Sequence, residues 1–165
     1  MGEQMNQGES EAKPEVDLDF VLWRVLDHTR FMISRLREKE LDQFGITPEM
    51  AYILDILTQR GGTTTINEIA EITVRRHHSI STQIARMARQ GLVKKIKNNR
   101  DLRGYDIVIT EKGQELFKRI TRNSIKEVFS CLSVEDKKAL DIRLKALLMH
   151  AYHLNKKEFR IRFHS

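Results

Sequence analysis

The sequence has a single cysteine, Cys131, among 165 residues, so a disulfide bond within the chain is excluded. One isolated thiol is typical of proteins in a reducing compartment, and we expect a cytoplasmic protein. No apolar run approaches the ~20 residues of a membrane-spanning helix. Residues 1–15 are polar and acidic, which fits neither a signal peptide nor a transit peptide, and we expect them to form a disordered tail.

The sequence also lacks the motifs that usually accompany catalysis. It has no glycine-rich phosphate-binding loop, no nucleophile elbow, and no Ser, His and Asp whose spacing singles them out. The carboxylates are spread over predicted helix surfaces, where solubility explains them. We therefore expect a protein that is not an enzyme and that holds no cofactor.

The positive charge, in contrast, is concentrated in one region. Residues 75–103 include nine Arg or Lys and one acid, a net charge of +8, whereas the whole protein carries +6. The rest of the chain is therefore close to neutral. A concentration of this kind indicates a polyanionic partner.

The first part of this basic stretch predicts a helix. Ile80, Ile84 and Met87 recur at the spacing of a helix that packs on a core. The opposite face is polar, short-chained and basic, and it comprises His78, Thr82, Ala85, Arg86 and Arg89. Such a face either contacts a nucleic acid or is an ordinary solvated surface, and the helix alone does not separate these two interpretations.

The second part of the stretch favours the nucleic acid. Gly91 is placed to end the helix, residues 92–97 and 105–110 read as strands, and residues 98–101 form a turn cluster. A helix followed directly by a basic hairpin is the layout of a winged helix-turn-helix. In that layout the helix enters the major groove, and the wing tip, residues 98–103, reaches the adjacent backbone or minor groove.

The flanking segments read as helices and one short strand. Residues 17–44 form a long helical pattern with apolar residues on more than one face, so part of it is expected to contact another subunit; burial within one chain is the alternative. Thr47 and Pro48 are typical of a helix start. Residues 63–65 predict a short strand beside the wing, and residues 65–68 are a capping box for the next helix.

The chain after the wing predicts two further helices. The first opens at residues 111–114 and runs through the apolar residues up to Phe129. The second opens at Ser133 in a capping-box-like sequence and extends at least to Tyr152. The pattern as a whole is a winged unit between helices at both ends.

At this point the sequence resembles the MarR family of transcriptional regulators. The most specific segment is residues 101–113, which match the family's D-x-R wing followed by an apolar strand, Thr and Gly. Supporting matches are Gln-Gly-Leu-Val at residues 90–93, Asn-Glu-Ile-Ala at residues 67–70, and a pair of leucines, Leu54 and Leu57. The resemblance covers roughly residues 17–154.

The resemblance implies a mainly α fold with a small β-wing, in which a winged helix-turn-helix is flanked by N- and C-terminal dimerisation helices. We expect a dimerisation helix at residues 16–45, the DNA-binding region at 46–113, and C-terminal dimerisation helices with a tail at 114–165. The expected partners are a second copy of the chain and double-stranded DNA, without a membrane.

For function, the resemblance implies a sequence-specific transcriptional regulator, with repression as the expected direction. Because a homodimer has two-fold symmetry, its operator is expected to be an inverted repeat. Most members of the family release DNA when a small molecule binds between the two regions. The rival hypothesis is a nonspecific architectural DNA-binding protein, and a third class is a protein-interaction module with a degenerate winged fold.

Candidate DNA-binding residues come from both parts of the basic stretch. In the helical part they are Arg75, Arg76, His77, His78, Ser79, Ser81, Thr82, Gln83, Arg86 and Arg89. In the wing they are Lys95, Lys97, Asn98, Asn99, Arg100 and Arg103. By the family motif, Asp101 would orient Arg103. The opening at residues 75–78, Arg-Arg-His-His, departs from the acidic or serine-rich opening that is commoner in the family.

Two sensing hypotheses follow from members of the family that respond to zinc or peroxide. His150 and His153 lie one helical turn apart, but a zinc site needs three or four ligands and no third one lies nearby in sequence. We therefore expect no metal site and read both as interface histidines. Cys131 has no adjacent base to lower its pKa, so a buried structural thiol is expected rather than a redox sensor.

Overall fold

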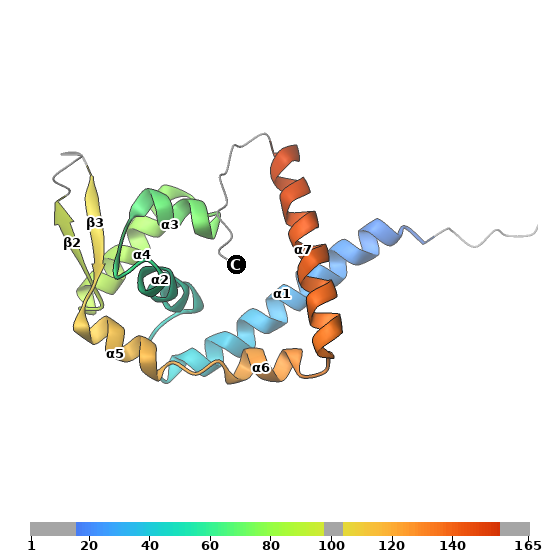
Figure 1. The fold of residues 1–165 in the computed structure, drawn as a ribbon, viewed down its shortest axis with the longest axis horizontal. Helices are drawn as coiled ribbons and strands as arrows, with labels where there is room; N and C mark the ends of the chain where they lie inside the picture. Colours follow the sequence, from blue (N-terminus) through green and yellow to red (C-terminus); the bar gives the residue numbers. More distant parts are fainter. Residues whose placement is uncertain (1–15, 98–103, 156–165) are drawn as a thin grey trace, which may run out of the picture. The chain divides into compact units, whose positions relative to one another are not determined.

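A computed structural model describes residues 16–97 and 104–155 of the chain (Figure 1). The predicted disordered tail and the wing tip therefore lie outside the described residues. The chain divides into two compact units, Met1–Met32 and Ile33–Ser165. Among the described helices, none combines the length and the apolar character that a membrane crossing needs.

The first unit consists, in its described part, of the N-terminal portion of α1 (Leu18–Asp42). Its large apolar side chains are exposed, and they are Leu18, Phe20, Leu22, Trp23, Val25, Leu26, Phe31 and Met32. The rings of Phe20 and Trp23 pack at a centroid distance of 5.4 Å. An apolar surface of this extent is unusual for a helix segment that stays in contact with water.

The second unit contains the predicted winged helix-turn-helix. Its elements are α2 (Pro48–Gln59), β1 (Thr63–Thr65), α3 (Ile66–Thr73), α4 (His77–Arg89), β2 (Val93–Lys97) and β3 (Tyr105–Ile109). The three strands form an antiparallel sheet in the order β1-β3-β2. Ile107 of β3 lies opposite Thr64 on one side and Lys95 on the other. The predicted wing strands and the short strand beside them are thus confirmed.

Local sequence signals explain where these helices start. The Thr47 hydroxyl accepts a hydrogen bond from the Met50 amide (3.2 Å), with Pro48 in the first turn. Thr65 and Glu68 form the predicted reciprocal capping box, with bonds of 3.2 and 3.0 Å. Each cap satisfies amide groups that the first turn of a helix leaves without a partner.

The core of the second unit lies between the helices and the sheet. Its fully buried side chains include Leu41, Ile53, Leu54, Leu57, Ile69, Ile80, Ile84, Met87, Leu92 and Ile107. The predicted inner face of α4 is confirmed, because Ile80, Ile84 and Met87 are each 0% exposed. This packing fixes the rotation of α4 about its axis and so decides which side chains face outward.

The turn between α3 and α4 contains an unusual backbone conformation. Val74 has φ 55° and ψ 39°, in the left-handed region that a β-branched residue rarely adopts. The following amide, of Arg75, donates to the Ala70 carbonyl at 3.0 Å and closes the end of α3. The packing of α3 and α4 against the core must offset this local strain.

The prediction of one helix after the wing is wrong. The structure has α5 (Glu111–Arg119) and α6 (Asn123–Phe129), separated at Ile120, whose ψ of 119° is extended rather than helical. The backbone amides that start α6 find an acceptor in α1, as described below, so tertiary contacts replace the helical continuation. The last helix, α7 (Val134–Leu154), begins at its predicted cap, Ser133, which accepts from the Asp136 amide at 3.0 Å.

The expectation of a buried Cys131 is also wrong. Its side chain is exposed between α6 and α7, and its thiol donates to the Val128 carbonyl at 3.3 Å. Exposed apolar residues continue along α7, and they include Ile142, Leu144, Leu147, Leu148, Met149 and Leu154. Helix α7, which follows this thiol, therefore has a largely uncovered apolar surface of its own.

Candidate nucleic-acid interface

Helix α4 presents a basic face opposite its buried one. Arg75, Arg76, His77, His78, Thr82, Arg86 and Arg89 are exposed, whereas Ser79, Ser81 and Gln83 are half-buried. The exposed residues combine cations with groups that donate and accept hydrogen bonds. Such a surface has the chemistry to contact phosphates and base edges.

The N-terminus of α4 is built without the usual stabilising groups. Arg76 occupies the N-cap position and makes no side-chain capping bond, and the first turn contains no acidic residue. Cations at this end oppose the helix dipole, which favours negative charge there. A phosphate group at this end would meet both the cations and the positive end of the dipole.

Thr82 lies in the middle of the exposed face. Its hydroxyl donates to the His78 carbonyl one turn earlier, at 3.0 Å. This bond fixes the rotation of a short, β-branched side chain without hiding it from solvent. A partner would therefore meet a surface of defined shape at this position.

Gln83 is turned towards α2. Its amide Nε2 donates to Glu49 Oε2 at 2.7 Å, and the other oxygen of the same carboxylate lies 3.7 Å from Arg75 Nε. The Gln83 Oε1 is buried and has no hydrogen-bond partner among the described residues. Glu49 thus ties the middle of α4 and the segment just before this helix to α2, a role that no local pattern in the sequence indicated.

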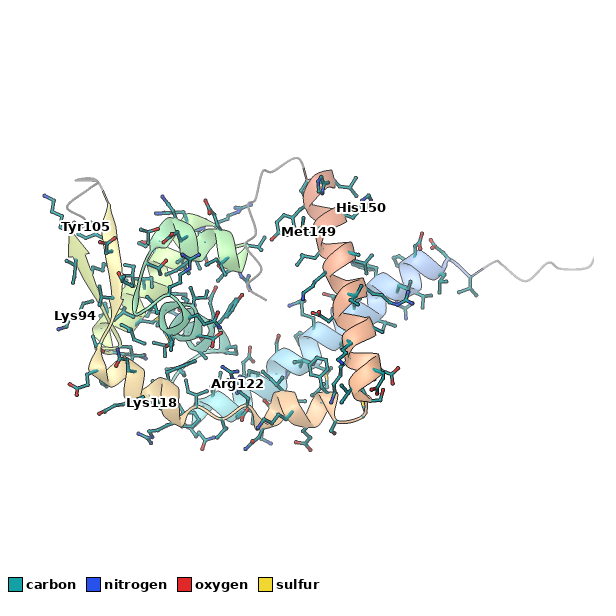
Figure 2. The ribbon with its side chains drawn as sticks, in the orientation of Figure 1. Lys94, Tyr105, Lys118, Arg122, Met149 and His150 are labelled. Atoms are coloured by element: carbon teal, nitrogen blue, oxygen red, sulfur yellow. The ribbon has the colours of Figure 1, made fainter. Side chains whose placement is uncertain are left out.

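The described part of the wing adds further positive charge. Lys94, Lys95 and Lys97 of β2 are exposed, and Figure 2 shows Lys94 and Tyr105 on the two wing strands. The candidates at the wing tip lie outside the described residues, and they are Asn98, Asn99, Arg100, Asp101 and Arg103. Strands β2 and β3 pair directly up to Lys97 and Tyr105, so they lead into that tip.

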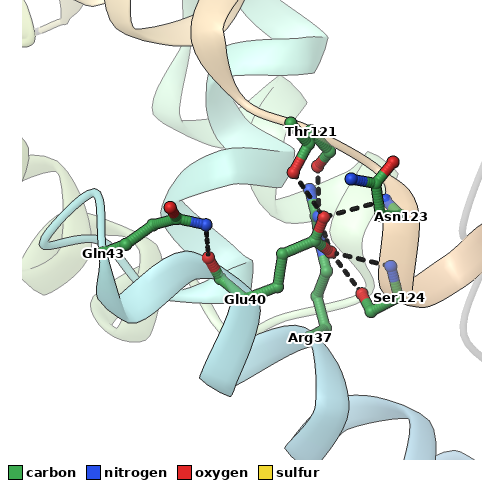
Figure 3. A network of polar contacts seen from close by, with 6 residues as sticks. All are labelled: Arg37, Glu40, Gln43, Thr121, Asn123 and Ser124. Atoms are coloured by element: carbon green, nitrogen blue, oxygen red, sulfur yellow. Dashed lines mark hydrogen bonds and ion pairs between the residues drawn. The ribbon is translucent and has the colours of Figure 1, made fainter.

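A second polar centre, which the sequence did not predict, lies where α5 meets α6. The Glu40 carboxylate of α1 accepts hydrogen bonds from the Thr121 hydroxyl, from the Asn123 and Ser124 amides and from the Ser124 hydroxyl (Figure 3). It also pairs with Arg37 at 2.7 Å. Burial raises the pKa of Glu40, but the hydrogen bonds from these partners outweigh it and bring the pKa down to about 2.

A cleft of about 600 Å³ lies beside this centre. Its walls combine apolar and aromatic groups with cations, and they include Tyr52, Phe117, Ile120, Arg37, Arg122 and Lys126. Burial, together with the nearby Asp55 carboxylate, raises the pKa of Tyr52. The lining suits a small molecule that has both an apolar body and an anionic group.

The histidines of α7 do not form part of a ligand cluster among the described residues, where no group of three His, Cys, Asp or Glu side chains is arranged to hold a metal. His153 Nδ1 lies 2.8 Å from the Met149 carbonyl of the preceding turn. Figure 2 shows His150 beside Met149 on α7.

A family model matches the central part of the chain. The model of the MarR family matches residues 44–104, which contain the winged helix-turn-helix up to the wing. A search of curated proteins finds no match. The matched segment includes the whole of α4 with its basic face.

Solved structures extend the similarity to most of the chain. The ligand-free form of RdhR-CbdbA1625, an organohalide-sensing transcriptional regulator, is 24% identical, with a TM-score of 0.82 and coverage of 96% of this chain and 99% of that one. Its form with bound 2,4-dichlorophenol has a TM-score of 0.81 at 23% identity, covering 97% of this chain and 100% of that one.

Two further structures come from proteins named as MarR or as members of its family. AbsC from Streptomyces coelicolor, a MarR family transcriptional regulator, is 26% identical, with a TM-score of 0.76 and coverage of 86% and 99%. A mutant MarR from E. coli in complex with operator DNA is 18% identical, with a TM-score of 0.73 and coverage of 81% and 99%. Residues 44–104 therefore match the MarR family model, and the described residues have the winged-helix fold of these solved structures.

Proposed function

We propose that this protein is a dimeric transcriptional regulator that binds a specific DNA sequence through α4. The observation that carries the proposal is the division of α4 into two faces. One face is locked in the core by Ile80, Ile84 and Met87, and the other presents exposed cations and hydrogen-bonding groups. A helix held in this way can read base edges because the core fixes its rotation about its own axis.

Each candidate residue has a proposed role according to its position. We assign DNA contacts to the exposed residues of α4 and the segment before it, namely Arg75, Arg76, His77, His78, Thr82, Arg86 and Arg89. Ser79, Ser81 and Gln83, which are half-buried, support that surface. Lys95, Lys97, Asn98, Asn99, Arg100 and Arg103 of the wing contact the backbone or the minor groove, with Asp101 orienting Arg103.

The dimer is part of the same proposal. Apolar side chains are exposed along α1 in the first unit and along α7 in the second, and a second copy of the chain would remove them from water. A dimer with two-fold symmetry would place two α4 helices on DNA. The operator is then an inverted repeat whose half-sites lie about one helical turn apart.

We further propose that the protein represses transcription and that a small molecule in the cleft beside Tyr52 releases it from DNA. The lining supports an aromatic acid or a phenol, because apolar walls and cations occur together there. The structural relative RdhR-CbdbA1625 has been solved with 2,4-dichlorophenol bound. These roles correspond to a cytoplasmic protein without catalytic activity.

The rival hypothesis, nonspecific DNA binding, makes a different prediction about affinity. After selection of bound fragments from genomic DNA, the selected duplex should be bound about 10³-fold or more tightly than a scrambled duplex of equal length. Arg86→Gln should weaken both complexes, whereas Lys138→Gln, which removes a cation from α7, should leave both unchanged. Equal affinity of the protein for the two duplexes would support the rival hypothesis and contradict the proposal.

A further inference from the structure

The connection between α5 and α6 is held by a residue from a distant part of the chain. Glu40, near the end of α1, lies 83 residues before Asn123, yet its carboxylate binds the backbone amides of Asn123 (2.8 Å) and Ser124 (3.2 Å). These amides belong to the first turn of α6. Figure 3 shows the carboxylate of Glu40 directed at this turn.

Glu40 supplies the cap that α6 itself lacks. Arg122 occupies the N-cap position of α6 but makes no side-chain capping bond. The first amides of any helix need an acceptor, and a negative charge at this end also interacts favourably with the helix dipole. The start of α6 is thus determined by the position of α1 rather than by its own preceding residues.

The carboxylate is itself fixed in place. Arg37, one turn earlier on α1, pairs with Glu40 at 2.7 Å and also donates to the Thr121 carbonyl of the connection. The two side chains are only 11% and 9% exposed, so the surrounding water screens their interaction weakly. These contacts leave the side chains of Arg37 and Glu40 few other positions, so the network holds both in one geometry.

A second contact ties the same connection to α2. Arg122 Nη2 lies 3.1 Å from Asp55 Oδ1. Figure 2 shows Arg122 in the connection, so the segment from Thr121 to Ser124 is bound from α1 and from α2. Both anchors are helices packed on or beside the core that positions α4, since Leu41 of α1 and Leu54 of α2 are fully buried in it.

We propose that Glu40 is the positioning residue that sets the direction in which α6 leaves the winged-helix region, and thereby the spacing between the two α4 helices of the dimer. The second part of this inference, on the spacing of the two α4 helices, rests on the proposed function. It goes beyond stabilisation, because a cap that only stabilised α6 would leave the choice of DNA spacing unchanged.

A small change of direction is sufficient for such an effect. Helix α7, which follows α6, has 21 residues and is about 30 Å long. A tilt of about 6° at one end of a lever of this length moves the other end by about 3.4 Å, which is the rise of one base pair. The connection therefore needs a rigid anchor if the dimer is to prefer one operator spacing.

The experiment compares Glu40→Gln with a matched control on the same helix. Glu38→Gln removes the same charge two residues earlier, at an exposed position. Affinities are measured for a duplex with one selected half-site and for duplexes with two inverted half-sites, at the selected spacing and at that spacing changed by two base pairs. Hydrogen exchange of the Asn123 and Ser124 amides is measured on the same proteins without DNA.

The expected results separate positioning from folding. Glu40→Gln should leave the half-site affinity within about twofold of the wild type, since α4 is untouched. Its preference for the selected spacing over the altered one should fall by about tenfold or more, and exchange of the two amides should rise by at least the same factor. Glu38→Gln should behave as the wild type in every measurement.

Milder variants keep the test decisive if Glu40→Gln fails to fold. Thr121→Val and Ser124→Ala each remove one hydroxyl donor to the carboxylate, and the two together should lower the spacing preference in the same direction. Unchanged amide exchange in the variants would overturn the proposal, and so would faster exchange with an unchanged spacing preference. A wild-type protein that binds no DNA would instead overturn the proposed function. Hydrogen exchange of the Asn123 and Ser124 amides would still test whether Glu40 anchors α6.

Discussion

Gly113 is a residue at which close packing leaves no room for a side chain. It lies in the first turn of α5, and a Cβ added there would lie 2.2 Å from the Leu92 carbonyl oxygen. Its amide donates to the Thr110 hydroxyl at 3.1 Å, and that hydroxyl donates to the Gly91 carbonyl at 2.7 Å. The helix after the wing thus rests directly on the backbone that leads into it.

Gly113→Ala should therefore destabilise the protein by about 2–4 kcal/mol, although alanine is the better helix former. The carbonyl it would meet belongs to the backbone and cannot rotate away as a side chain would. Denaturant unfolding at fixed protein concentration measures the change. Gln114→Ala, at the next and exposed position of α5, should shift the stability by less than about 0.5 kcal/mol. A Gly113→Ala variant as stable as the wild type would contradict the packing described for α5.

At the scale of the elements, part of the structure follows from local sequence and part does not. The caps at Thr47, Thr65 and Ser133 and the inner face of α4 were predictable, because each depends on residues within a few positions of one another. The break between α5 and α6 was not, since its cause is an acceptor on α1 more than 80 residues earlier. The helical spacing of apolar residues continues through this break between α5 and α6, so it gives no sign that the helix ends.

The candidate interface was predictable to a similar degree. The buried face of α4 determined which of its residues are exposed, and the expectation for Thr82, Arg86 and Arg89 agrees with their exposure. Gln83 lies near the boundary between the two faces, and its direction depends on Glu49 of α2. The exposure of Cys131 was missed because its burial was inferred from the lack of an adjacent base, which bears on the reactivity of a thiol and not on its position in the fold.

The Glu40 cap also predicts how stability depends on pH. Its pKa in the folded protein is about 2, below the ordinary value of 4.5, so its contribution is present above about pH 4.5 and is lost as the pH falls towards 2. The difference in unfolding free energy between the wild type and Glu40→Gln should accordingly be largest at neutral pH and shrink through this range. Urea unfolding of both proteins at pH 7, 4 and 3 measures it. A difference that stayed constant with pH would mean that the charge of Glu40 is not what holds α6.

At the scale of the whole molecule, the apolar residues of α7 lead to a prediction about assembly. Leu147 is exposed among other apolar residues of this helix, so Leu147→Glu should shift the protein from dimer to monomer. Analytical ultracentrifugation over a range of concentrations measures this shift. Lys138→Glu, which changes a residue on the opposite face of α7, should leave the assembly unchanged. A Leu147→Glu variant that dimerised as well as the wild type would place the contact between copies elsewhere.

The central claim is that the exposed face of α4 reads DNA sequence, and one comparison tests it most directly. Thr82→Gln changes the middle of that face, while Thr58→Gln changes an exposed threonine of α2 whose hydroxyl makes the same bond to a carbonyl one turn earlier. Affinities for the selected and the scrambled duplex are measured for both variants. We predict that Thr82→Gln lowers the affinity for the selected duplex by about tenfold or more and leaves the affinity for the scrambled duplex within about twofold of the wild type. Thr58→Gln should change neither affinity. Equal losses on both duplexes, or no loss on either, would contradict base recognition by α4.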